Sequence, residues 1–190
     1  THGAILQDLR LDGRTLTLGS PDLAPYDDGP MRHFGAVVGP VAGRLRDGRG
    51  LLEGRMLELP PTGLPHNLHS AAAPLHAADW EVTEVSGGAV TLAVTAAPGE
   101  GGLPGARRFT ARYALSQDAL TLTLTAETDA PTWVNLTHHG FWSLGGAARG
   151  GIGGGVDAHA LRIDADRALP IDDEVLPTGE VRAVAGTPLD

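Results

Sequence analysis

The sequence predicts an all-β protein, and three observations carry that prediction. Three segments alternate apolar and polar residues with the two-residue period of a strand. No stretch of eleven or more residues places apolar side chains at helical spacing. The chain also has 14 prolines and 27 glycines, which is typical of many short strands joined by turns. Together these features indicate antiparallel sheets packed as a sandwich or closed as a barrel.

The clearest alternation is in residues 119–128, ALTLTLTAET, where Leu120, Leu122 and Leu124 share one face and threonines occupy the other. Residues 89–96 (AVTLAVTA) and 108–115 (RFTARYAL) follow the same period. Only a half-buried strand explains such a pattern well. We therefore expect the three segments to pair as an antiparallel meander.

Two Asp-Gly pairs, Asp12-Gly13 and Asp47-Gly48, lie between apolar segments. Asp-Gly supplies the positive backbone angles that tight hairpin turns require, so a hairpin is predicted at each. The composition of residues 145–155, GGAARGGIGGG, predicts a flexible loop. Its glycine spacing does not match the dinucleotide-binding fingerprint.

The composition favours one ordered domain over residues 1–190, with 42% apolar and 19% charged residues. The formal net charge of −9 disfavours nucleic acid and anionic membranes as partners and suits a neutral ligand. Cysteine is absent, which excludes disulfides and thiolate metal sites. Without a long apolar stretch or a signal-like N-terminus, the expected location is the cytoplasm. The sequence does not specify an oligomeric state.

The polar residues that stand out are Arg44, His66, Asn67, His69, and the adjacent pair His138 and His139. Histidine can transfer protons near neutral pH, and the nearby rings of Phe141 and Trp142 can form an apolar wall against a sugar.

Other chemistries have less support. A metal site built from His66, His69 and one histidine of the later pair is a weak alternative, because the cupin-like arrangement of His-x-His followed closely by Glu is absent. A serine nucleophile is disfavoured because no G-x-S-x-G elbow occurs. His2, His33, His76 and His159 are interpreted as surface or structural residues.

Several separated motifs, in this order, resemble the aldose 1-epimerase family, also called galactose mutarotases. They are FGAVVGPVAGRLRDGR, HNLHS with Trp80 downstream, GEGGLPGARRFTARYAL, VNLTHHGFWSL and LPIDDEVLPTGEVRAVAGTPLD. The resemblance implies a large antiparallel β-sandwich with an open groove for a free sugar such as galactose or glucose. It also implies interconversion of the α and β anomers without cofactor or metal.

Position by position, the resemblance implies that His69 and His139 are catalytic, with His139 the proton donor to the ring oxygen. It implies that Arg44 binds sugar hydroxyls, and we add Asn67 and Trp142 as expected sugar contacts. Pro40, Gly43 and the Ser70-Ala71 pair depart from the family pattern, which usually has Arg, Asn and Gly-Gly there.

The family places its glutamate base and a sugar-binding aspartate after the Pro-Thr-Gly-Glu segment, hence beyond Asp190. The resemblance thus implies that residues 1–190 correspond to the N-terminal two thirds of the family fold, with the sandwich incomplete at the C-terminus. Glu180 matches a loop glutamate and is not expected to serve as the base. Two alternatives stay open: a catalytically silent sugar-binding homologue, and an epimerase acting on a sugar phosphate, for which Arg44 and Arg46 would supply charge.

Overall fold

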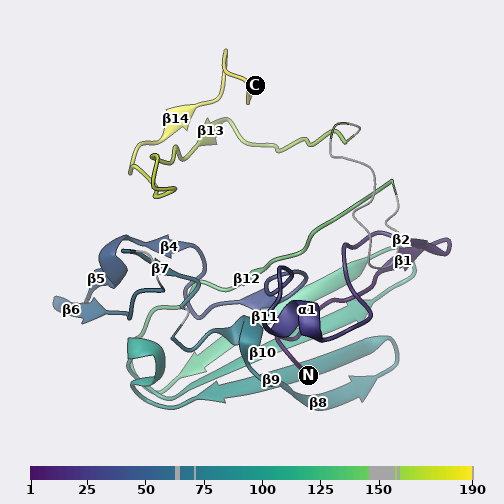
Figure 1. Cartoon of the computed structure of the whole chain (residues 1–190), viewed down its shortest axis with the longest axis horizontal. Helices are drawn as coiled ribbons and strands as arrows, with labels where there is room; N and C mark the ends of the chain where they lie inside the picture. The colour runs from purple at the N-terminus through teal and green to yellow at the C-terminus, as the bar shows by residue number, and fades with distance from the viewer. Residues whose placement is uncertain (63–64, 71, 146–156, 158, 190) are drawn as a thin grey trace.

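The computed structural model describes residues 1–62, 65–70, 72–145, 157 and 159–189. Its largest element is a four-stranded antiparallel sheet in the order β11-β10-β9-β8 (Figure 1). The strands are β8 (Glu81–Ser86), β9 (Ala89–Ala96), β10 (Arg107–Leu115) and β11 (Leu120–Thr128). The predicted meander of the three alternating segments is confirmed, because β9, β10 and β11 pair in sequence order.

One face of this sheet forms the core. Phe109 and Ala111 of β10 are fully buried, and Leu92 of β9 is 6% exposed. The three leucines of β11 pack against the same cluster, while its threonines face outward. Tyr113 is also buried, and its hydroxyl donates a hydrogen bond to the carbonyl of Ala4 at 2.7 Å. The two-residue period thus separates a buried face from a solvated one, as expected for a strand.

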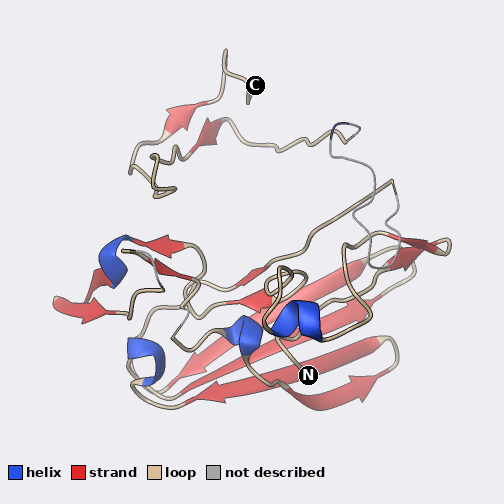
Figure 2. Cartoon of the chain, viewed as in Figure 1, coloured by secondary structure: helices blue, strands red, loops and turns tan. Residues whose placement is uncertain are grey.

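Short strand pairs complete the sheet-rich architecture (Figure 2). These pairs are β3 (Val37–Val38) with β12 (Thr137–His138), β4 (Arg44–Leu45) with β7 (Asn67–Leu68), β5 (Arg49–Leu52) with β6 (Arg55–Glu58), β1 (Arg10–Leu11) with β2 (Arg14–Thr15), and β13 (Arg167–Ala168) with β14 (Arg182–Ala183). Val37 and Trp80 join the core cluster of the large sheet, so the two layers share one apolar interior.

Helical structure in the described part of the chain is limited to single turns. The α-helix α1 covers Ala24–Asp27, and the 3-10 turns are η1 (Arg46–Gly48), η2 (Leu75–Ala77) and η3 (Glu100–Gly102). A turn of three or four residues is too short for apolar periodicity to reveal. None of the described helices is long and apolar enough to cross a membrane.

One predicted hairpin is confirmed and the other is wrong. Asp12 and Gly13 connect β1 to β2 with φ values of 50° and 76°. Asp47 and Gly48 also have positive φ, but the strands that flank them pair elsewhere, β4 with β7 and β5 with β6. The β5–β6 hairpin turns instead at Glu53-Gly54, with φ of 48° and 78°. The predicted loop at residues 145–155 falls almost entirely outside the described residues.

Candidate functional site

Four histidine rings converge between the short strand pairs. The ring centroids of His69 and His139 are 5.8 Å apart, although 70 positions separate these residues in the sequence. His33 lies 5.1 Å from His69 and 5.5 Å from His139. His76 adds a buried fourth ring, 4.3 Å from His33. We call these four residues the histidine cluster.

A left-handed turn directly after β7 presents His69. His69 and Ser70 have φ values of 56° and 54°, which residues other than glycine rarely adopt. The buried side chain of Asn67 holds this turn, since its Oδ1 accepts a hydrogen bond from the Ser70 N–H at 3.2 Å and its Nδ2 donates to the Pro60 carbonyl at 2.7 Å. Ser70 Oγ accepts a further bond from the Val41 N–H at 2.8 Å. These bonds stabilise a backbone for which the family usually has glycine.

The imidazole of His69 is fixed as one tautomer. Its Nδ1 accepts a hydrogen bond from the backbone N–H of Gly43 at 3.0 Å, so in the neutral ring the proton is on Nε2. Burial, reinforced by His33, His139 and Arg44, lowers the pKa of His69 from 6.5 to about 4. At neutral pH His69 is therefore an uncharged donor through Nε2–H.

His139 is held by backbone bonds and ring contacts. Its N–H donates to the Ala36 carbonyl at 2.9 Å, and its carbonyl accepts from the Gly35 N–H at 2.8 Å. Its ring stacks on Phe141 at 5.1 Å, and Phe141 stacks on Phe34 at 3.9 Å. The ring makes no hydrogen bond or ion pair with a described residue, so both nitrogens are available to a ligand.

The adjacent His138 has a different environment. Its ring lies 6.1 Å from the buried ring of Tyr113, and its Nε2 is buried without a hydrogen-bond partner among the described residues. Burial lowers its pKa, against the opposing effect of a hydrogen bond to the Gly35 backbone. Successive strand residues point to opposite faces, which explains why the two neighbours differ.

The other two members of the cluster are also uncharged at neutral pH. Burial, with His33 the largest additional cause, lowers the pKa of His76 to about 3. Burial and the neighbouring His139 lower the pKa of His33 as well. The cluster thus resists accumulation of positive charge, because each protonated ring disfavours protonation of the next.

The remaining predicted site residues lie in three different environments. Arg44, on β4, is half-buried and close enough to His69 to lower its pKa, and its guanidinium makes no hydrogen bond or ion pair with a described residue. Asn67 is 1% exposed, with its side chain bonded to backbone groups as described above. Trp142 is 48% exposed, and the aromatic ring in contact with His139 is that of Phe141. Sugar contacts by Asn67 and Trp142 stay predictions.

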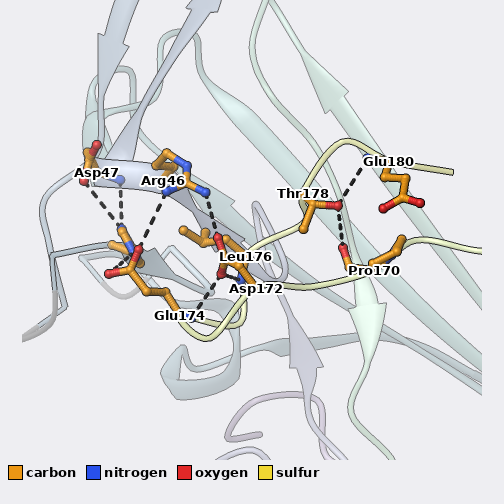
Figure 3. A network of polar contacts seen from close by, with 9 residues as sticks. Arg46, Asp47, Pro170, Asp172, Glu174, Leu176, Thr178 and Glu180 are labelled. Carbon is orange, nitrogen blue, oxygen red and sulfur yellow. Dashed lines mark hydrogen bonds and ion pairs between the residues drawn. The ribbon is translucent and has the colours of Figure 1, made fainter. Parts of the chain in front are cut away.

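His66 lies outside the cluster, in a polar network with Asp47 and Glu174, both labelled in Figure 3. Its Nδ1 accepts a hydrogen bond from the Asp47 N–H at 3.1 Å, and its Nε2 lies 3.7 Å from a carboxylate oxygen of Glu174. Arg46 donates to Asp172 at 3.0 Å and lies 3.7 Å from Glu174 (Figure 3). This network attaches residues 172–174 to the region of β4 and η1.

Among the described residues, no group of three or more His, Cys, Asp or Glu side chains is arranged to hold a metal ion. Glu180 is exposed and bonded to Arg182 at 2.8 Å.

Sequence reasoning interpreted His33 and His76 as surface or structural residues and did not place their rings next to His69 and His139. His33 directly precedes the FGAVVGPVAGR motif, and His76 lies between His69 and Trp80. Their positions next to two family motifs were the available signal. The contacts themselves arise from tertiary packing between segments far apart in the sequence.

The cluster combines a neutral donor at His69, a ring with two available nitrogens at His139 and a guanidinium at Arg44. Together these groups can hydrogen-bond a polyhydroxyl ligand and exchange a proton with it. Two hollows of about 400 and 420 Å³ lie elsewhere and are lined mainly by apolar residues. Neither is lined by a residue of the cluster.

Comparison with known proteins agrees with this chemistry. The family model described as aldose 1-epimerase matches residues 1–190. Human galactose mutarotase is 34% identical over 175 residues, which cover 92% of this chain and 49% of the human protein. Escherichia coli aldose 1-epimerase is 30% identical over 194 residues, covering 99% of this chain and 54% of that protein.

A solved structure supports the fold. The crystal structure of a GalM/aldose epimerase homologue from C. elegans superposes with a TM-score of 0.83 at 26% identity, covering 99% of this chain and 57% of that one. The chain spans about half the length of the curated relatives it matches.

Proposed function

Because the chain belongs to the aldose 1-epimerase family, we propose that it interconverts the α and β anomers of a free aldose such as galactose or glucose. The observation that carries this proposal is the approach of His69 and His139, whose ring centroids are 5.8 Å apart. One sugar placed against both rings can receive a hydrogen bond from His69 and a proton from His139.

In the proposed reaction His139 is the general acid. It donates a proton to the ring oxygen as the bond between that oxygen and the anomeric carbon breaks, while a base removes the proton of the anomeric hydroxyl. The open-chain aldehyde forms, its carbonyl group turns, and the ring oxygen attacks the other face. On closure His139 takes its proton back from the attacking hydroxyl, and the base returns its proton to the carbonyl oxygen, which becomes the new anomeric hydroxyl, so protons and bonds balance over one cycle.

His69 supports this transfer without changing its own charge. With its pKa lowered to about 4, it is neutral near pH 7 and donates only from Nε2. A fixed donor aimed at a sugar oxygen orients the substrate and stabilises developing negative charge. Arg44 binds sugar hydroxyls through its fork of N–H donors, which are not used by any described residue.

The base is proposed to be a carboxylate, as the family resemblance implies. Among the described residues, no ion pair joins a carboxylate to His69 or His139. The described residues therefore supply the acid half of the proposed mechanism. Because the reaction transfers protons and breaks and re-forms one C–O bond without changing the oxidation level of the sugar, it calls for no redox cofactor.

The test is polarimetry of freshly dissolved α-galactose and α-glucose with the protein at its full encoded length. The proposal predicts that optical rotation reaches equilibrium faster in proportion to protein concentration. An unchanged spontaneous rate with every aldose tried, from a protein shown to be folded, would contradict it. A sugar 6-phosphate run in parallel shows whether a phosphorylated substrate is preferred.

A further inference from the structure

We propose that His33 is a positioning residue for the proton donor, holding the His139 ring against Phe141 in the orientation that proton transfer requires. This inference rests on the proposed function of His139. It adds a residue to the site that the family motifs quoted above do not include.

The evidence begins with a series of ring contacts. Phe34 stacks on Phe141 at 3.9 Å, Phe141 on His139 at 5.1 Å, and His139 on His33 at 5.5 Å. The planes in successive pairs differ by 15°, 23° and 23°. Two consecutive residues, His33 and Phe34, thus bracket the pair formed by His139 and Phe141. Offset stacking of this kind favours one relative orientation of the rings.

The orientation of the His139 ring rests on contacts with neighbouring rings. His69 is oriented by the hydrogen bond from Gly43, whereas the His139 ring makes no hydrogen bond with a described residue. A bond of that kind would occupy a nitrogen that the proposed proton donor needs. Contacts on the two ring faces orient the imidazole and leave both nitrogens open to the sugar.

The ring of His33 is itself in contact with a buried ring, that of His76. The ring of His76 meets it edge to face at 4.3 Å, and His76 is 7% exposed. His76 is fixed by η2, and the Leu75 carbonyl next to it accepts a hydrogen bond from the indole of buried Trp80 at 2.9 Å. The support for His139 therefore runs from the core through His76 to His33.

This arrangement predicts which property of His33 matters. An aromatic ring at position 33 should preserve the stacking, whereas a short side chain should release the His139 ring. Misplacing a catalytic group by a small distance can slow a reaction by up to about 100-fold. The loss should appear in kcat and leave KM nearly unchanged, since His33 is not assigned a hydrogen bond to the sugar.

The experiment compares His33→Phe and His33→Ala with the wild-type protein at full encoded length, using anomer exchange to obtain kcat and KM. We expect His33→Ala to lower kcat about 10-fold or more at similar KM, and His33→Phe to retain most of kcat. Equal kcat for His33→Ala and the wild type would overturn the proposal, as would a loss in His33→Phe as large as in His33→Ala.

A second readout separates this proposal from the proposed function. Nuclear Overhauser contacts between the ring protons of His139 and Phe141 report the stacking whether or not the protein is an epimerase. They should persist in the wild type and in His33→Phe and weaken in His33→Ala. If wild-type protein does not accelerate anomer exchange, the proposed function fails, and unchanged ring contacts in folded His33→Ala would refute the positioning role independently.

Discussion

The backbone N–H of Gly43 donates a hydrogen bond to Nδ1 of His69 at 3.0 Å and so determines which nitrogen of that ring bears the proton. The two residues come from different segments, since Gly43 precedes β4 and His69 follows β7. The pairing of β4 with β7 brings them together. A backbone contact made by strand pairing therefore sets the chemical state of a predicted catalytic residue.

His69 is predicted to be a neutral donor through Nε2–H across the physiological pH range. Nitrogen-15 NMR of the ring should show this tautomer at pH 7, with protonation only near pH 4. His69→Gln keeps an N–H donor and should retain more activity than His69→Ala, which we expect to lose about 10-fold or more. A ring that titrates near pH 6.5 would contradict this assignment.

Stability should fall in acid because burial lowers the pKa values of His69 and His76. Both rings have an ordinary pKa of 6.5 and fall to about 4 and about 3 in the folded state. Below pH 6.5 the unfolded chain binds more protons than the folded one, so the free energy of unfolding decreases as pH falls through this window. Above pH 6.5 both states are neutral at these positions, and the contribution is constant.

The matched variant for this effect is His76→Phe, which keeps a ring of similar size but cannot be protonated. Urea unfolding between pH 7.5 and 4.5 should show a shallower loss of stability than in the wild type. At pH 7.5 the variant should be as stable or more stable, because the buried Nδ1 of His76 has no hydrogen-bond partner among the described residues. An unchanged pH slope would disprove the assignment to His76.

Asn67 is predicted to matter for stability and, through the turn it holds, for His69. Asn67→Ala removes two side-chain hydrogen bonds to backbone groups and leaves buried groups unpaired, at a cost of about 1–3 kcal/mol. Asn135→Ala is the control, since the exposed Asn135 side chain makes one bond, to the Ala42 carbonyl. Urea melts that show equal losses for the two variants would argue against this role.

Asp172 is predicted to attach the C-terminal part of the described chain to Arg46. A hydrogen bond from the Leu176 N–H is the largest cause of a lowered pKa for its carboxyl group. Hydrogen bonds from Arg46 and from the Glu174 N–H lower this pKa further. Stabilisation by this group is present above its ordinary pKa of 3.8 and is lost as pH falls through the lowered value.

Asp172→Asn should therefore increase amide hydrogen exchange at Leu176 and Thr178. Asp164→Asn provides the comparison, because Asp164 pairs with Arg162 where both side chains are more than four-fifths exposed. Equal exchange rates in both variants and the wild type would show that the Asp172 contacts do not restrain this segment.

The sequence was informative where a local pattern decides the structure. The alternation of leucine and threonine in residues 120–125 predicts both the strand and its buried face, because a strand with one solvated face requires that period. Asp12-Gly13 predicts its hairpin because Asp-Gly supplies the positive φ values that a tight turn requires. At Asp47-Gly48 the turn chemistry is correct, since both φ values are positive, but strand partners are chosen by distant segments.

In the candidate site, too, some residues were identified from sequence motifs and others only from packing between distant segments. His69, His139 and Arg44 were identified because their motifs resemble the family in order, and the structure brings all three together. His33 and His76 could not be assigned this way, because a single histidine outside a motif has no local pattern to distinguish a site residue from a surface one. Only packing between segments places their rings beside His139.

The central claim is that His139 donates the proton that opens the sugar ring, and anomer exchange in a His139→Gln variant tests it most directly. Glutamine keeps polar atoms but cannot transfer a proton, and losing a general acid typically costs about 100-fold or more in rate. His159→Gln is the control, since exposed His159 lies outside the cluster and, among the described residues, accepts a bond only from the Leu144 N–H. The account predicts a large loss in His139→Gln and none in His159→Gln, and wild-type exchange by folded His139→Gln would contradict it.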